Sequence, residues 1–312
     1  MSIIRAVFLG TPEFARAQLE FLSKDDHYEI VGVVTQPDRP AGRHLHLQPS
    51  PVKKFALEKG YKVISPEKIT TDVIAEVSAL KAEVAVVVAF GQILPQAFLD
   101  LFPAKAVNIH ASLLPRWRGA APIQRAIMAG DKETGVVLQV IVKKLDAGDV
   151  IGKYSLPISD DTDALKMLSD MVPLGQRLLH VDLMDYMRGH ISPRAQDESL
   201  VTYAHKIDKA EAKLDLNLPA RELFNRLRGL VMGPGSNIVR NGKILKLHKV
   251  KLLESVKASK PGVVTAVEAD HFVVSCGQGA LALYEVQPES SKRMSAKDYM
   301  LGHTVKVGDI FE

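Results

Sequence analysis

An amide and an imidazole lie two residues apart near the middle of the chain, in the segment Asn108-Ile109-His110. Together with Ala106 and Val107 this segment is typical of a short buried β-strand, on which side chains two apart share a face. An amide donor beside an imidazole can stabilise a developing oxyanion and move a proton. A lone histidine on a strand is more often structural, so it is the pair that marks a candidate catalytic site.

Two irregular segments follow this strand. Residues 112–122 hold the only tryptophan, two arginines and two prolines, a composition that suits neither a helix nor a strand. Residues 145–149, Leu-Asp-Ala-Gly-Asp, form a glycine-containing turn after a strand expected at 136–142. Acidic residues in turns usually cap the backbone or face solvent. A carboxylate close to the site would instead orient His110 and favour its charged form.

The elements that must position these residues alternate along the first half of the chain. Apolar runs predict strands at 3–9, 29–35, 61–64, 84–89, 106–110 and 136–142. Helical spacing predicts helices at 12–22, with Thr11 as N-cap, and at 72–80, 122–129 and 162–187. This alternation predicts an α/β fold with a doubly wound, mostly parallel sheet, Rossmann-like in outline. Asn108 and His110 then lie at the carboxyl end of a parallel strand, where open sheets place their sites.

The pattern changes after Gly189. Residues 190–207 are polar and loop-like, and we expect a linker there between a catalytic domain (1–189) and a C-terminal domain (208–312). A helix is expected at 219–230, then short strands at 237–239, 244–253, 262–267, 271–275 and 281–286. Asn241-Gly242 is a strong hairpin signal. Short strands with regular turns predict a small, OB-like β-barrel.

Composition excludes several classes of function. Only one glycine occupies the turn Gly10-Thr11-Pro12, and no phosphate-binding loop is present, which argues against NAD and ATP sites. Cys276 is the only cysteine, so disulfides and cysteine-rich zinc sites are excluded. We expect a cytoplasmic protein, because no signal peptide or membrane-spanning run is present. Residues 201–312 hold 17 Lys and Arg against 12 Asp and Glu, an excess that favours a polyanionic partner.

Taken together, Asn108-Ile109-His110, Ser112-Leu113-Leu114-Pro115, Arg118-Gly119 and Asp146-Ala147-Gly148-Asp149 resemble the signature of the 10-formyltetrahydrofolate-dependent formyltransferases. In that family the catalytic trio corresponds to Asn108, His110 and Asp146. Segments 10–14, 35–43, 48–53 and 117–125 resemble the branch of the family that formylates methionyl-initiator tRNA. The resemblance extends over nearly the whole chain.

The resemblance implies 10-formyltetrahydrofolate as co-substrate, methionyl-initiator tRNA as acceptor, no metal and a monomeric chain. The folate is expected to contact the turns after two strands: Phe90, Gly91, Ile93, Leu94, Ser112, Leu113, Leu114, Pro115, Gly148 and Asp149. The tRNA is expected to contact basic residues of a long loop and of the C-terminal domain: Arg39, Arg43, Lys246, Lys249 and Lys251. Residues 44–47, His-Leu-His-Leu, depart from the family's lysine-containing loop, and without a nearby cysteine they do not indicate a metal site.

Two other interpretations stay open at this point. A formyltransferase that acts on a small amine, such as glycinamide ribonucleotide or an amino-sugar nucleotide, would share the trio. A non-catalytic RNA-binding protein built on an inactive enzyme core is also possible. The loop at 37–43 and the basic second domain argue against the first, and the intact trio argues against the second.

Overall fold

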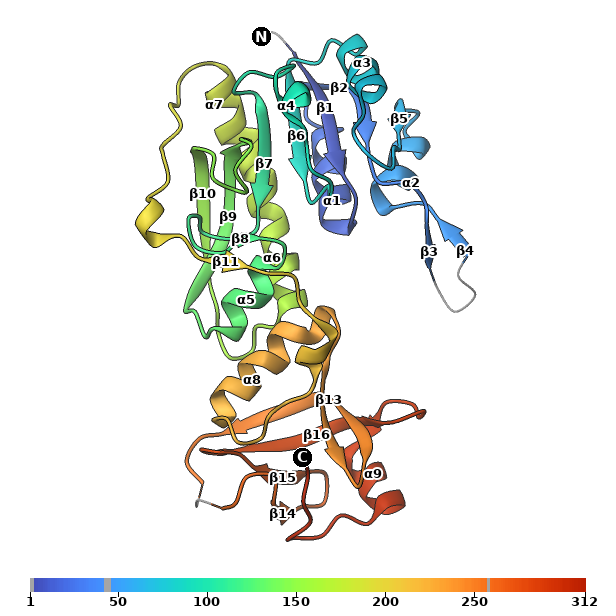
Figure 1. Ribbon diagram of the computed structural model, residues 1–312, viewed down its shortest axis with the longest axis vertical. Coiled ribbons are helices and arrows are strands. Elements are labelled where there is room, and N and C mark those ends of the chain that lie inside the picture. The colour runs from blue at the N-terminus through green and yellow to red at the C-terminus, as the bar shows by residue number, and fades with distance from the viewer. Residues whose placement is uncertain (1–2, 42–45, 257–258) are drawn as a thin grey trace. The chain divides into compact units, whose positions relative to one another are not determined.

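The computed structural model describes residues 3–41, 46–256 and 259–312. Contacts divide the chain into two compact units (Figure 1). The first comprises residues up to Pro122 together with Glu133–Pro157 and Leu168–Ala204. The second comprises Ile123–Lys132, Ile158–Met167 and His205–Glu312. Each unit is therefore assembled from segments that are separated in sequence.

A seven-stranded sheet forms the centre of the first unit, in the order β10-β9-β7-β6-β1-β2-β5. Five strands are parallel: β1 (Ile4–Gly10), β2 (Tyr28–Val34), β5 (Val63–Ile64), β6 (Val84–Val88) and β7 (Ala106–His110). Two are antiparallel: β9 (Glu133–Val140) and β10 (Val150–Pro157). The predicted doubly wound, mostly parallel sheet is confirmed, and β10 is an edge strand that the sequence pattern did not indicate.

Helices cover both faces of this sheet. The helical segments of the N-terminal half in this unit are α1 (Glu13–Leu22), α2 (Pro51–Glu58), α3 (Thr71–Ala79) and α4 (Gln96–Leu99), whereas α5 (Pro122–Met128) belongs almost wholly to the second unit. Alternate residues of β1 and β6 pack with Val77 of α3 and Phe98 of α4 in one apolar cluster. Helix α1 contacts β1 and β6 and lies on the other side of the sheet (Figure 1). Burial on both faces explains why the parallel strands are almost wholly apolar.

Two helix predictions were wrong in detail. Thr11 does not cap α1: its hydroxyl donates to the carbonyl oxygen of Phe90 at 2.9 Å, and the helix begins at Glu13 after Pro12. The expected helix at 162–187 is interrupted. It consists of α6 (Ala164–Arg177), a π-helical turn η1 (Leu178–Asp182) and α7 (Leu183–Met187). Apolar spacing does not reveal the turn because the flanking α-helices keep the same period.

Three further short pairings and turns complete the first unit. Strands β3 (Arg39–Ala41) and β4 (His46–Gln48) form an antiparallel pair, and a 3₁₀ turn η2 spans Glu198–Leu200. Strand β8 (Arg118–Gly119) pairs in parallel with β11 (Tyr203–Ala204). Residues 203–204 lie within the segment that we expected to be a linker, so this pairing holds part of 190–207 against the loop that follows His110.

The second unit contains an antiparallel sheet in the order β12-β13-β16-β15-β14, and β17 also pairs with β16. Its strands are β12 (Ser236–Arg240), β13 (Lys243–Leu253), β14 (Val264–Val267), β15 (Phe272–Ser275), β16 (Ala280–Pro288) and β17 (Met294–Ser295). Its helical segments are η3 (Lys209–Ala212), α8 (Ala220–Gly229), η4 (Leu230–Met232) and α9 (Ala296–His303). Asn241 and Gly242 both have positive φ, as the expected hairpin requires.

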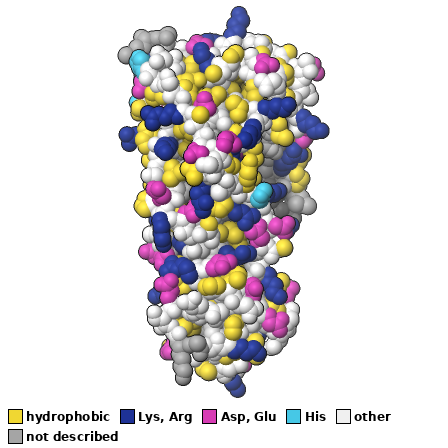
Figure 2. Space-filling model, turned by 60° about the vertical axis from the view of Figure 1, so that its left-hand side comes forward, with side chains coloured by type: hydrophobic (Ala, Val, Ile, Leu, Met, Phe, Trp, Pro, Cys, Tyr) yellow, Lys and Arg dark blue, Asp and Glu magenta, His cyan; other side chains and the backbone are white. Residues whose placement is uncertain are grey.

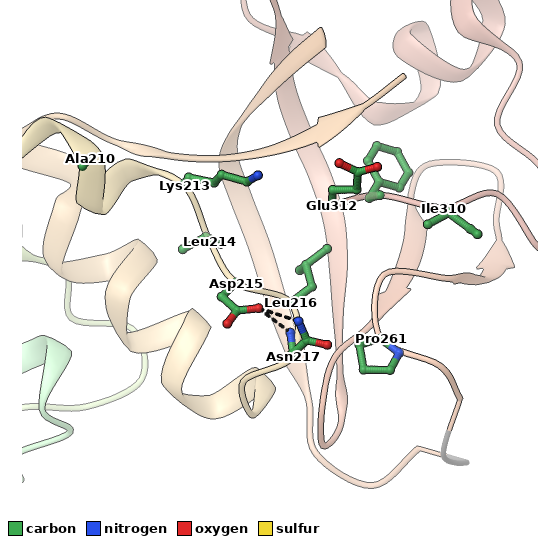
Figure 3. Close-up of a pocket in the computed structure, with 10 residues that line it drawn as sticks. Ala210, Lys213, Leu214, Asp215, Leu216, Asn217, Pro261, Ile310 and Glu312 are labelled. Carbon is green, nitrogen blue, oxygen red and sulfur yellow. Dashed lines mark hydrogen bonds between the residues drawn. The ribbon is translucent and has the colours of Figure 1, made fainter. Parts of the chain in front are cut away.

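Residues 309–312 join the two edges of this sheet. Glu312 exchanges two backbone hydrogen bonds of 2.7 Å with Val239 of β12. On the other side, Val264 of β14 donates to Asp309, and Phe311 donates to Gly262, each at 2.8 Å. The unit is therefore a small barrel, as predicted. An open hollow of about 580 Å³ lies between these residues and residues 210–217 (Figure 3). In the described part of the chain, no helix is long and apolar enough to cross a membrane.

Candidate active site

Strand β7 presents Asn108 and His110 on one face, close to the carboxyl ends of the parallel strands. Asn108 lies opposite Gln139 of the antiparallel neighbour β9, so these two side chains share that face. On the other side, Val88 at the end of β6 is in register with Ile109. The loop that follows β6 therefore starts beside Asn108 and His110, as the sheet topology predicts for a binding site.

His110 is held in one orientation. Only 6% of the residue is exposed, and its Nε2 atom lies 2.9 Å from the carbonyl oxygen of Trp117. Because a carbonyl oxygen only accepts hydrogen bonds, Nε2 carries a hydrogen. The other ring nitrogen, Nδ1, faces Asp146 with a distance of 3.7 Å to Oδ2. The imidazole thus bridges the irregular loop and the acidic turn.

Asp146 is fixed by hydrogen bonds to each carboxylate oxygen. The backbone N–H of Gly119 donates to Oδ2 at 2.8 Å, and Gln139 Nε2 donates to Oδ1 at 3.1 Å. Asp146 also has a φ of +46°, a left-handed conformation that non-glycine residues rarely adopt and that clusters at functional sites. The turn therefore aims its carboxylate at His110 at some conformational cost.

A second layer of side chains holds the acidic turn. Gln196 Nε2 donates to the carbonyl oxygens of Asp146 (2.8 Å) and Gly148 (2.7 Å). Arg118 is fully buried, and its guanidinium donates to Gln196 Oε1 (2.9 Å) and to Glu198 Oε1 (2.8 Å). Hydrogen bonds from Arg118 and then Lys144 lower the pKa of Glu198 to about 2. A segment distant in sequence thus fixes the backbone of residues 146–148.

Gln139 and Gln196 were not among the predicted site residues. Gln139 had a detectable signal, because it is the only polar residue in the aliphatic run 136–142, and it is 98% buried in the structure. A polar side chain in a strand buried on both faces must find a partner, since an unmet buried amide costs about 1–3 kcal/mol. Gln196 lies in a polar segment and had no comparable signal.

The expected folate-contacting residues occupy two loops next to this site. The side chain of Phe90 belongs to the apolar core, so only its backbone is available, and its carbonyl accepts bonds from Thr11 and Gln36. Gly91 has a φ of +80°, and Ile93 is 89% exposed. An exposed apolar side chain beside a catalytic candidate is a suitable contact for a flat aromatic ligand.

The remaining folate candidates have mixed environments. Ser112 is fully buried and donates to the carbonyl oxygen of Arg116 at 2.7 Å, so it shapes its own loop. A Cβ atom at Gly148 would lie 1.7 Å from the carbonyl oxygen of Val140, so only glycine fits. Of the others, Leu114 is buried, Leu94, Leu113 and Pro115 are half-buried, and Asp149 is exposed. The hollow in the second unit is lined by none of these residues.

The candidate tRNA contacts divide between the units. Arg39 forms an exposed ion pair with Glu67 at 2.8 Å, and Arg43 lies outside the described residues. Lys246, Lys249 and Lys251 are all exposed along β13. Strict alternation would place Lys246 on the face opposite the other two. The pairing with β16 shifts register on both sides of Lys249, which moves all three lysines to the outer surface.

The core side of β13 confirms this arrangement. Leu245 and Leu247 are buried in the barrel core, and Val250 and Leu252 pack against it. The core-facing side chains thus change from odd-numbered to even-numbered positions along the strand. This change requires the irregular pairing near Lys249. Elsewhere, acidic and basic side chains are interspersed on the face shown in Figure 2. The outward face of β13 therefore carries a row of lysines, which we call the lysine row, and a local irregularity of the strand produces it.

Two family models match the chain. The model for formyl transferase matches residues 4–179, and the model for the formyl transferase C-terminal domain matches residues 206–304. An N-formyltransferase from Helicobacter canadensis, solved with folinic acid and dTDP-3-aminofucose, has the same fold, with a TM-score of 0.69 at 19% identity over 94% of this chain and all of that one. Fold and site thus define the class, an enzyme that transfers formyl groups.

Relatives that match nearly the whole chain show which family of formyl-transferring enzymes this is. Methionyl-tRNA formyltransferase of Bdellovibrio bacteriovorus is 53% identical over 99% of both chains. The Bacillus subtilis enzyme of the same name is 43% identical over 98% of this chain and 97% of its own. The chain belongs to the methionyl-tRNA formyltransferase family.

Proposed function

We propose that the chain transfers the formyl group of 10-formyltetrahydrofolate to the α-amine of methionyl-initiator tRNA. The observation that carries this function is the convergence of Asn108, His110 and Asp146 in a chain that matches methionyl-tRNA formyltransferases from end to end. The small-amine alternative is not favoured. The N-formyltransferase of Helicobacter canadensis that was solved with dTDP-3-aminofucose shares the fold but only 19% of aligned residues.

The transfer is an acyl transfer in which Asn108 supplies the oxyanion donor. The amine nitrogen bonds to the formyl carbon, the carbonyl oxygen becomes negative, and the bond from carbon to N10 of the folate then breaks. Asn108 is half-exposed, and its side chain has no hydrogen-bond partner within the described residues. It is therefore available to donate to the negative oxygen at the moment the charge develops.

His110 and Asp146 hold and move the proton. The amine loses one proton as it attacks, and N10 gains one as it leaves, so no net proton is consumed. Asp146 faces His110 across the 3.7 Å gap, and its own carboxylate is kept in place by Gly119 and Gln139. His110 assists the oxyanion or relays the proton once one of its ring nitrogens turns from Trp117 or Asp146 towards the substrate. The step uses neither a covalent enzyme intermediate nor a metal.

The folate and the tRNA occupy different parts of the chain in this proposal. The exposed loop at 91–94 and the turn at 146–149 border the catalytic trio, which suits the folate. The Helicobacter canadensis enzyme of the same fold was solved with folinic acid. The lysine row of β13 suits phosphate groups, since clustered lysines attract polyanions without reading sequence.

The decisive experiment uses purified protein, 10-formyltetrahydrofolate and radiolabelled methionyl-tRNA of the initiator and elongator types. We expect rapid formylation of the initiator alone. Formylation of glycinamide ribonucleotide or an amino-sugar nucleotide, with neither tRNA modified, would establish the alternative instead.

A further inference from the structure

A second cluster of chemically capable side chains lies outside the active site. The segment between α1 and β2 supplies Asp25 and His27, and the π-helical turn η1 supplies His180. His27 Nδ1 lies 2.7 Å from one carboxylate oxygen of Asp25, and His180 Nδ1 lies 2.7 Å from the other. One potential ligand atom from each residue lies within 4.8 Å of the other two. We propose that Asp25, His27 and His180 bind a divalent transition-metal ion of the zinc type.

The three residues provide a suitable donor set. Two imidazole nitrogens and one carboxylate are preferred ligands of Zn²⁺ and related ions, with bonds of about 2.0–2.2 Å. Such bonds in tetrahedral geometry place neighbouring ligand atoms roughly 3.3 Å apart. The two imidazoles now bond different oxygens of Asp25, so the ring that bonds the ligating oxygen must retreat from it by about half an ångström. The side chains of His27 and His180 are 36% and 51% exposed, so both rings have room for this movement.

The carboxylate is prepared for this role, whereas the outer side of the site is open. The side chain of Asp25 is 5% exposed, and it also accepts a hydrogen bond from the backbone N–H of His27 at 3.1 Å. The edge of the Phe21 ring packs against His180, with 6.1 Å between centroids. Three protein ligands and an exposed face leave further positions for water or an exogenous ligand.

The local helix geometry supports a functional role for His180. It lies in a π-helical turn between α6 and α7, and single π turns occur often at functional positions. Asp25 and His27 immediately precede β2, so the cluster is at the amino ends of the parallel strands. Asn108 and His110 lie at the opposite, carboxyl ends of the parallel strands. A metal here would join segments about 150 residues apart without entering the transfer reaction.

Zinc binding is measured with the full, untagged chain after treatment with a chelator. Isothermal titration with ZnCl₂ at pH 7.5 is expected to show one bound ion per chain, together with a rise in Tm. Repeating the titration in buffers of different ionisation enthalpy detects any proton displaced from Nδ1. We expect His27→Ala and His180→Ala each to weaken binding by at least about tenfold, since outer-shell changes alone have effects of this size.

The matched control is His190→Ala. His190 also faces a single carboxylate, with 3.3 Å from its Nδ1 to Asp185 Oδ1, but has no second histidine in its ion pair. We expect this variant to bind zinc as the unaltered chain does. Absence of binding at 1 mM Zn²⁺ overturns the proposal, and so does equal binding by the double variant His27→Ala/His180→Ala. Circular dichroism and formylation activity establish that each variant is folded.

Discussion

The side-chain amide of Gln196 donates to the backbone carbonyl of Asp146 at 2.8 Å, although fifty positions separate the two residues. The same amide group reaches the carbonyl of Gly148, so one side chain holds both sides of the acidic turn. Arg118 in turn donates to Gln196 Oε1. The segment after residue 190 thereby controls the geometry of a residue that we place in the catalytic trio.

Replacing Gln196 tests this control. We expect Gln196→Glu to lower kcat at least about tenfold with a small effect on the KM for tRNA, because a misplaced catalytic group acts on the transition state. The variant keeps the acceptor for Arg118 and loses the donors to residues 146 and 148. Asp197→Ala is the control, since Asp197 is exposed and its side chain bonds Ser199 rather than the acidic turn. Unchanged kcat in Gln196→Glu would show that residues 146–148 keep their conformation without the hydrogen bonds from Gln196.

Asn108→Ala removes the proposed oxyanion donor. Loss of one such donor lowers turnover by roughly 10² to 10³. We expect a decrease of that size in kcat, measured in single turnover with bound folate, and a larger one for Asp146→Ala. Folate binding, followed by fluorescence quenching of Trp117, provides the control for an intact site. Turnover equal to that of the unaltered chain would remove either residue from the mechanism.

The sheet and most of its elements could be predicted from sequence because burial on two faces imposes long aliphatic runs. Asn108 and His110 stood out for the same reason: they are polar residues at the end of such a run. Gln196 could not be found in this way, since its importance comes from tertiary bonds to a distant turn. Strand β10 has one fully buried residue, Ile151, and contains Gly152 and Pro157, residue types that strands disfavour, so its sequence gives a weak strand signal.

The periodicity of apolar residues could not predict local irregularities either. Alternation predicted that Lys249 and Lys251 share one face of the strand. Lys246 lies on the same face because the pairing of β13 with β16 shifts register, and the sequence does not reveal this shift. The π-helical turn at His180 leaves no trace in apolar spacing. Thr11 looked like a helix cap because threonine before proline commonly is one, yet the Phe90 carbonyl is its partner.

Gly148→Ala tests the close approach of two backbone segments. The added Cβ would meet the Val140 carbonyl oxygen at 1.7 Å, and backbone atoms cannot yield as a flexible side chain can. We expect the free energy of unfolding to fall by about 1–3 kcal/mol and kcat to decrease. Gly302→Ala is the control, because nothing lies within 4 Å and the position is helical. Urea titration of both variants distinguishes a steric clash from a general effect of alanine.

The lysine row of β13 should determine tRNA affinity more than turnover. We expect the triple variant Lys246→Ala/Lys249→Ala/Lys251→Ala to raise the KM for tRNA and leave kcat at saturation nearly unchanged. Each lost phosphate contact lowers the slope of log affinity against log salt by about 0.7–0.9. The triple alanine variant at Lys292, Lys297 and Lys306 removes the same charge from other exposed positions of the second unit. Equal effects of the two variants would mean that only net charge matters.

Cys276 provides a probe of the barrel core. It is 3% exposed, and burial raises the pKa of its thiol to about 12. The raised pKa keeps the thiol neutral and unreactive up to that pH. We expect negligible reaction with Ellman's reagent at pH 8 in the folded chain, and one equivalent in denaturant. Rapid reaction of the folded chain would indicate that the barrel opens locally.

Closure of the barrel by residues 309–312 has a consequence for biosynthesis. Val239 of β12 and Val264 of β14 find these partners only when Asp309 and Glu312 have been translated and have left the ribosome. Until then the nascent chain carries two strand edges that are open at these positions, which are sites for pairing with other chains. A nonsense or frameshift mutation just before codon 309 would therefore leave most of the enzyme intact and still produce an aggregation-prone protein.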